Sequence, residues 1–158
     1  MKLKNFIAMA ALALVAVSCS DDDEEVVNHS EVIAGDYAGE MVQVVMDTES
    51  RGEQTLTLKA QNDGRLTLVF PASGEGSSMS SPEIQVKDLN LVEGSNGEIS
   101  FSIPSTDTIA VVNDETKKKY LYTNMRGSVK DQKLKLTYKA KMGRMPFWMD
   151  ATFNGTKK

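Results

Sequence analysis

Apolar and polar residues alternate along most of the chain from residue 34 onward. The alternation is clearest near the C-terminus, where Leu134, Leu136 and Tyr138 fall on one face and the lysines around them fall on the other. Such period-two alternation predicts strands with one buried face. Turn residues interrupt the pattern roughly every eight to twelve positions, and no stretch keeps a helical period. The pattern predicts an all-β fold of eight or nine antiparallel strands, arranged as a barrel or a sandwich.

The same alternation predicts which side chains point into the core. The inward face is expected to carry Leu56, Leu58, Leu66, Leu68, Phe70, Ile99, Phe101, Leu121, Met125, Leu134, Leu136, Tyr138, Phe147, Met149 and Phe153. These side chains are bulky, so we expect a mostly filled interior with any cavity shallow and placed at one mouth. In this phase Tyr120 and Tyr122 point outward. A change of phase between Val86 and Leu89 predicts a β-bulge at residues 87–88.

The first eighteen residues have the pattern of a targeting segment. Lys2 and Lys4 precede twelve consecutive apolar residues, which end shortly before Cys19. Twelve residues are too few to span a bilayer as a helix, which needs about 20, but they suit the core of a signal peptide. We therefore expect three parts, which are a signal peptide at 1–18, a polar linker at 19–33 and one folded domain at 34–158.

The residues before Cys19 indicate how the chain is anchored. The sequence Ala16-Val17-Ser18-Cys19 resembles a bacterial lipobox, with Ala16 at the place where Leu is more usual. The resemblance implies cleavage before Cys19 by signal peptidase II and acylation of the cysteine with fatty acids such as palmitate. The mature protein would then be a lipoprotein held at a membrane. The alternative is an ordinary secretory peptide followed by an incidental or buried cysteine.

An acidic run follows the cysteine and consists of Ser20, Asp21, Asp22, Asp23, Glu24 and Glu25. Like charges at this density repel one another and stay solvated, so the segment is expected to be an extended, disordered spacer. The run also resembles the export signal of lipoproteins in some Gram-negative gut anaerobes. That resemblance implies a lipid-anchored position in the outer membrane, facing the cell exterior. The alternative is a lipoprotein that faces the periplasm and has an acidic tether.

Short motifs mark both ends and the middle of the folded part. The segment AGDYAG at 34–39 fits a G-x-Y-x-G pattern, and MPF at 145–147 with FNG at 153–155 fits an M-P-F … F-x-G pattern. Between them, MRGSV at 125–129 followed by Lys133-Leu134 fits a hairpin pattern. Together these motifs resemble the calycin-like β-barrel lipoproteins, a lipocalin-related family of Gram-negative bacteria. The resemblance implies an up-and-down barrel whose last strand pairs with the first, and none of its motif residues is catalytic.

The composition excludes several kinds of chemistry. With one Cys and one His, the chain lacks an intrachain disulfide and a zinc site built from Cys and His alone. His29 falls in the polar linker, so nucleophile–histidine catalysis lacks a base. A carboxylate pair for glycoside hydrolysis is not indicated, because the candidates are scattered near turns or on outward positions. These candidates are Asp107, Asp114, Asp131 and Asp150. We expect a protein that is not an enzyme and holds no metal or cofactor.

Charge is divided unevenly along the chain. The net charge is −4 at pH 7, which argues against nucleic acid as a partner. Residues 36–115 hold 4 basic and 14 acidic groups, whereas residues 116–158 hold 12 basic and 2 acidic groups. In a barrel, the two halves would attract each other across the closing seam. Alternatively, the basic half would meet anionic glycans or lipopolysaccharide phosphates. Its lysines include Lys117, Lys118, Lys119, Lys133, Lys135, Lys139 and Lys141.

Aromatic and Met side chains near the last strand form the candidate ligand site. Met142, Met145 and Trp148 lie close together in the sequence, and Tyr120 and Tyr122 take the outward phase. Flat aromatic rings stack on sugars, and Met adapts to irregular apolar surfaces. The sequence favours a monomeric, non-catalytic module that binds a small apolar or glycan ligand at the barrel rim. The alternative is a structural or accessory surface protein with a filled barrel, whose partners are other proteins.

Overall fold

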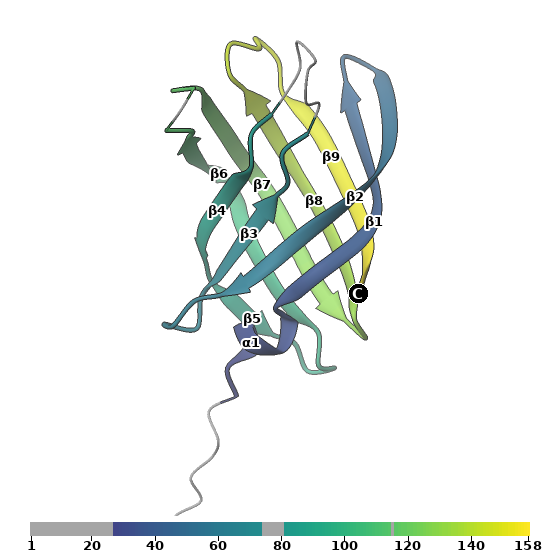
Figure 1. The fold of residues 1–158 in the computed structure, drawn as a ribbon. Coiled ribbons are helices and arrows are strands. Elements are labelled where there is room, and N and C mark those ends of the chain that lie inside the picture. The colour runs from purple at the N-terminus through teal and green to yellow at the C-terminus, as the bar shows by residue number, and fades with distance from the viewer. Residues whose placement is uncertain (1–26, 74–80, 115) are drawn as a thin grey trace, which may run out of the picture.

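The computed structural model describes residues 27–73, 81–114 and 116–158, which form one short helix and nine strands. The elements are α1 (His29–Ile33), β1 (Gly35–Val45), β2 (Thr48–Ala60), β3 (Leu66–Phe70), β4 (Ile84–Leu89), β5 (Leu91–Glu93), β6 (Ile99–Val112), β7 (Lys119–Lys130), β8 (Lys133–Met142) and β9 (Met149–Lys157). All nine strands belong to one antiparallel sheet, which curls into a barrel with α1 at one end (Figure 1). The expected all-β barrel is confirmed.

The strands follow one another around the barrel in the up-and-down order β4-β3-β2-β1-β9-β8-β7-β6-β5. The last strand pairs with the first, from Tyr37 opposite Lys157 to Val44 opposite Asp150. Only Asn90 separates β4 from β5, yet β4 pairs with β3 and β5 pairs with β6. These two short strands therefore act as one bent strand that joins both ends of the sheet and nearly closes the barrel.

Two glycines let β1 and β9 approach closely where the barrel closes. Gly39 lies directly opposite Gly155 in the register. A Cβ atom on Gly39 would overlap the backbone carbonyl of Asn154, so a larger residue would push the strands apart. Gly39 and Gly155 are the final glycines of the AGDYAG and FNG motifs. These motifs therefore specify the close approach of the first and last strands.

The inward faces of the strands form one continuous apolar core, and most side chains expected to point inward are buried in it. Phe101 is 2% exposed, and its ring occupies the space that a Cβ of Gly127 on the neighbouring strand would need. The expectation is wrong at two positions. Leu121 and Phe147 are only partly buried and lie outside this core.

A β-bulge in β4 confirms the predicted change of phase at residues 87–88. The register between β3 and β4 shifts between Leu66 and Leu68, and Asp88 adopts a left-handed φ of 62°. Because of the extra residue, Val86 and Leu89 both reach the core, although strict alternation would separate them. The bulge lies just before the point where the chain changes from pairing with β3 to pairing with β6.

A second bulge lies in β7 and reverses the phase that alternation predicts there. The register between β7 and β8 shifts between Thr123 and Arg126, and Asn124 has a φ of 47°. Before this bulge, Tyr120 and Tyr122 are buried, with exposures of 3% and 1%. The expectation that both tyrosines face outward is therefore wrong, because one inserted residue moves every side chain beyond it to the other face.

The folded part begins at α1, before the expected boundary at residue 34. Ile33 is buried in the core, and its carbonyl accepts a hydrogen bond from Tyr37 Oη at 2.8 Å. His29 Nε2 lies 3.3 Å from Glu93 Oε2, and this contact joins α1 to β5. The expectation that His29 lies in a linker outside the domain is wrong. Residues 28–33 instead pack against one end of the barrel.

Candidate binding site

Large aromatic side chains occupy the interior of the barrel. The rings of Phe70 and Tyr122 stack with centroids 5.4 Å apart and 8° between their planes. Tyr138 is tilted against both, with centroids at 5.2 Å from Phe70 and 5.9 Å from Tyr122. Tyr138 Oη also donates a hydrogen bond to Met41 Sδ at 3.8 Å. This cluster fills its part of the barrel by close aromatic packing and leaves no room there for a ligand.

Burial keeps the central tyrosines neutral. Loss of solvent raises the pKa of Tyr122 and of Tyr138 well above the ordinary value near 10, and the neighbouring phenols add to the rise at Tyr122. Neither hydroxyl is therefore a base or a negatively charged ligand at neutral pH. These residues are core side chains with polar ends.

The rim opposite α1 carries part of the expected ligand site. The chain between β8 and β9 lies at this end of the barrel (Figure 1). Trp148 is 38% exposed and Met145 is partly exposed, whereas Met142 packs against the core. Because Tyr120 and Tyr122 are buried, the five expected side chains do not gather on the surface. Trp148 and Met145 remain and are called the rim patch below.

A depression of about 420 Å³ lies at the α1 end of the barrel. Its lining includes Val32, Lys157 and Lys158. Lys157 Nζ donates a hydrogen bond to the carbonyl of Val32 at 3.3 Å, and Lys158 Nζ donates to Thr55 Oγ1 at 3.1 Å. Lys157 thus holds α1 and Lys158 holds the chain end against the barrel. The depression lies between these packed segments.

A larger depression of about 790 Å³ lies on the outer side of the barrel, across β5 to β9, and is called the lateral groove below. Strand register places two rows of outward side chains next to each other in it. These rows are Ser100, Ser128, Lys135 and Asn154, and Ser102, Arg126, Thr137 and Thr152. Six of the eight side chains are short hydroxyl or amide groups, and two are cations. The groove therefore offers hydrogen bonds together with positive charge.

The basic residues of the second half are spread over several sites. Lys135 lines the lateral groove, whereas Lys139 forms an ion pair with Asp150 at 3.2 Å. Lys117 and Lys118 lie between β6 and β7. The expected basic wall is thus interrupted by ion pairing and by loops. The groove itself was not indicated by any one segment, because its two rows of outward side chains come from alternate positions on four strands.

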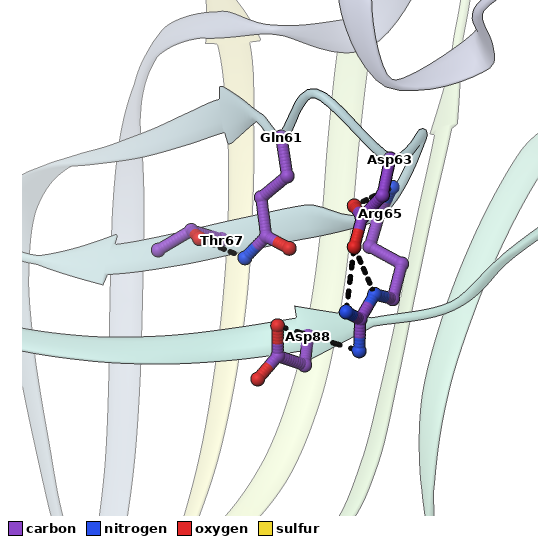
Figure 2. A network of polar contacts seen from close by, with 5 residues as sticks. All are labelled: Gln61, Asp63, Arg65, Thr67 and Asp88. Atoms are coloured by element: carbon purple, nitrogen blue, oxygen red, sulfur yellow. Dashed lines mark hydrogen bonds and ion pairs between the residues drawn. The ribbon is translucent and has the colours of Figure 1, made fainter.

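A network of charged and polar side chains surrounds the bulge in β4 (Figure 2). Arg65 Nε donates to Asp63 Oδ2 at 2.7 Å, and Arg65 Nη1 lies 3.4 Å from Asp88 Oδ1. The Gln61 amide contacts Thr67 Oγ1 at 2.8 Å. If the oxygen and nitrogen of this amide are exchanged by a flip, the Gln61 side chain donates to Asp88 Oδ1 at 3.1 Å and accepts from the Asp88 N–H at 3.2 Å. The network supports the left-handed Asp88 and has a structural role.

Electrostatics within this network match that role. Hydrogen bonds from the Arg65 side chain and its backbone N–H hold the pKa of Asp63 below its ordinary value. The same pairing raises the pKa of Arg65. Both groups stay charged at neutral pH, so neither supplies a proton for catalysis.

Carboxylates elsewhere are arranged as solvated surface groups. Asp107, Asp114, Asp131 and Asp150 are all exposed. Within residues 27–73, 81–114 and 116–158, no group of three or more His, Cys, Asp and Glu side chains is placed to hold a metal ion. The same part of the chain contains no helix long and apolar enough to cross a membrane. The candidate lipidation site Cys19 and the acidic run from Ser20 to Glu25 lie outside the described residues.

The described geometry defines a β-barrel with a packed interior, whose accessible chemistry lies on its rim and outer wall. Residues 33–156 match the family model of the calycin-like beta-barrel domain, and the chain belongs to this family. A search of curated proteins found no match.

One solved structure with the same fold is a "putative outer membrane protein" from Bacteroides fragilis. The two chains share 20% sequence identity and superpose with a TM-score of 0.60. The match covers 81% of the present chain and 52% of the other, so this chain spans about half the length of that protein. At this identity the likeness demonstrates the fold alone.

Proposed function

We propose that this protein is a membrane-tethered, non-catalytic binding module that contacts its ligand with the outside of the barrel. The filled interior around Phe70, Tyr122 and Tyr138 supports this proposal, because it leaves the rim patch and the lateral groove as the accessible surfaces. The absence of a nucleophile–base pair in the composition supports a non-catalytic role. A single observation carries the proposal furthest. The helix α1, which follows the N-terminal segment, lies at the end of the barrel opposite the chain between β8 and β9 (Figure 1), and that chain contains Trp148.

This arrangement determines which end of a tethered barrel is attached. If Cys19 carries the anchor, the spacer enters the barrel at the α1 end, and the rim with Trp148 is the free end. A single acyl chain holds a protein only marginally, so we propose attachment through more than one chain. The location proposed is the outer membrane, with the barrel facing the cell exterior. The name of the Bacteroides fragilis protein with the same fold supports an envelope location.

Replacing Cys19 with alanine should release the protein from the membrane. Without the thiol no acyl chain can be attached there, and the domain would be left without its proposed anchor. The measurement is the share of protein in membrane and soluble fractions, with Cys19→Ala compared against Ser20→Ala as the control. A Cys19→Ala variant that still sediments with the membrane would show that the lipid anchor is elsewhere or absent.

The acidic run can be tested in the same cells. We expect protease added to intact cells to digest the wild-type protein and to spare a variant with residues 21–25 replaced by alanine, because the latter would stay on the periplasmic side. Both proteins should remain in the membrane fraction. If protease spares the wild type as well, the protein faces the periplasm and the proposed exterior display is wrong.

Trp148→Ala should weaken ligand binding far more than it weakens the fold. This is the only tryptophan of the chain, so its fluorescence reports on ligands at the rim in the wild type, and calorimetry measures the affinity of the variants. Loss of a stacking ring should lower affinity about tenfold, which corresponds to about 1.4 kcal/mol. The free energy of unfolding should change by less than about 1 kcal/mol, because the side chain is substantially exposed.

The screen that uses this variant takes fatty acids and uncharged oligosaccharides as probes. The matched control is Val112→Ala, which shortens a side chain that is 52% exposed on another strand end. Binding that is lost in Trp148→Ala and kept in Val112→Ala supports the rim patch. If Trp148→Ala and the wild type bind every probe with equal affinity, the rim patch is not the ligand site.

The second candidate function is a structural or accessory surface protein, and the filled interior favours it as well. In that case the partner is another protein, and neither small apolar molecules nor glycans bind. Crosslinking on intact cells would then join the barrel to a neighbouring envelope protein, whereas the Trp148 fluorescence would respond to no probe in the screen.

A further inference from the structure

We propose that the lateral groove binds anionic saccharides. Arg126 and Lys135 would hold the carboxylate or sulfate of the sugar, and the hydroxyl and amide groups around them would hold its hydroxyls. The proposal rests on the binding function proposed above and adds a ligand class and a site on the wall of the barrel, separate from the rim patch.

The register of β7 and β8 creates the centre of this site. Arg126 lies opposite Thr137, and Ser128 lies opposite Lys135. The two cations therefore occupy one diagonal of a four-residue square, and the two hydroxyls occupy the other. Diagonal neighbours in an antiparallel pair lie about 7–8 Å apart. Long, flexible side chains at that spacing can both reach one anionic group on a sugar ring.

Two carboxylates on the strands beside the groove already have cationic partners. Glu40 lies 3.4 Å from Arg51, and Asp150 lies 3.2 Å from Lys139. In the described part of the chain, the ion pairs involve neither Arg126 nor Lys135. One carboxylate lines the groove, that of Asp107. The groove therefore keeps a net positive charge with two cations available to an outside anion.

The side chains that flank the square favour a sugar over other anions. Ser100 and Ser102 border it on β6, and Thr152 and Asn154 border it on β9. These groups donate and accept hydrogen bonds in an open depression of about 790 Å³, which is the size range of small-ligand sites. The lining contains two exposed apolar side chains, Val92 and Pro104, and neither is aromatic. A protein partner would instead require buried aromatic or aliphatic anchors.

The test measures binding to the full mature protein by calorimetry. The probes are oligogalacturonate, a chondroitin sulfate oligosaccharide, an uncharged malto-oligosaccharide, and inorganic sulfate and phosphate. Arg126→Gln with Lys135→Gln should reduce affinity for both anionic oligosaccharides at least about tenfold, because two charge-assisted contacts are lost. The control is Lys130→Gln with Lys133→Gln, a cross-strand pair outside the groove that removes the same charge. The control should keep affinity within about twofold.

A second variant tests whether the groove recognises the sugar itself or only attracts its negative charge. Thr137→Val with Thr152→Val keeps both cations and removes two hydroxyls, so affinity for the anionic oligosaccharides should fall about fivefold or more. Loss of affinity that is equal in the groove and control variants, or binding of inorganic phosphate as tight as that of the oligosaccharides, would overturn the proposal. So would failure of both anionic probes to bind. If the Trp148 screen succeeds in that case, only the groove assignment fails and the binding function stands.

Discussion

Phe101→Ala should lower the free energy of unfolding by about 3–5 kcal/mol. Phe101 is 2% exposed, and its ring lies against Gly127, which has no side chain to fill the space. The loss therefore combines apolar contact area with an unfilled cavity. Equilibrium unfolding in urea, monitored by the fluorescence of Trp148, measures the change. Val92→Ala is the control, because Val92 is 64% exposed on the strand beside Phe101 and should cost less than about 0.5 kcal/mol.

The pairing of Phe101 with Gly127 can be tested by a double-mutant cycle. Gly127→Ala alone should destabilise by about 1–3 kcal/mol, because the new Cβ overlaps the Phe101 ring. In the Phe101→Ala background the same change should cost little, since the ring is gone and the methyl group enters the cavity. The coupling energy should therefore exceed about 1 kcal/mol. Additive effects in the cycle, or a Phe101→Ala cost below about 1 kcal/mol, would contradict the packing described.

Period-two alternation predicted the barrel because most strands have one face in water and one in the core, although all five residues of β3 are buried. It also located the bulge at Asp88, since the apolar residues on both sides of that position change phase in the sequence. The bulge at Asn124 left no such mark. Leu121 and the flanking Tyr120 and Tyr122 are all large and partly apolar, so either phase gives a plausible inward face. The sequence feature that could have indicated this bulge is Asn124 itself, because asparagine tolerates positive φ better than most residues.

The helix α1 is five residues long, too short for a helical period to appear. Its capping pattern was nevertheless present. Asn28 accepts a hydrogen bond from the Ser30 N–H at 3.2 Å, and its amide donates to Glu31 at 3.1 Å. A capping residue followed three positions later by Glu is typical of a helix start. That pattern would have moved the domain boundary to residue 28.

The lateral groove shows a different kind of limit. In sequence, Arg126, Lys135 and Thr152 are ordinary outward polar residues on three strands. Their proximity depends on the register, which the bulge at Asn124 and the close approach of Gly39 to Gly155 help to set. Alternation predicts the face on which a residue lies, but it cannot predict the residue opposite it. The sequence shows that residues 116–158 are basic. It does not show which of these cations form ion pairs, as Lys139 does, and which remain available, as Arg126 and Lys135 do.

All four tyrosines of the chain are buried, which makes the fold sensitive to alkali. Burial raises the pKa of Tyr37, Tyr120, Tyr122 and Tyr138 above the ordinary value near 10. A folded-state pKa above the unfolded one gives stability that is fully present below about pH 10 and is lost as the pH rises further.

The free energy of unfolding should therefore fall by at least about 3 kcal/mol between about pH 8 and pH 11, since the unfolded chain ionises Tyr122 and Tyr138 at about 1.4 kcal/mol each. Urea unfolding at a series of pH values measures this. In Tyr122→Phe, which keeps the ring stacked on Phe70, the same pH change should cost about 1.4 kcal/mol less. The tyrosinate absorbance of Tyr122 and Tyr138 in the near ultraviolet should appear only as the protein unfolds. Reversible ionisation of all four tyrosines near pH 10 in the folded protein would mean that their hydroxyls reach water, and the packed interior would be wrong.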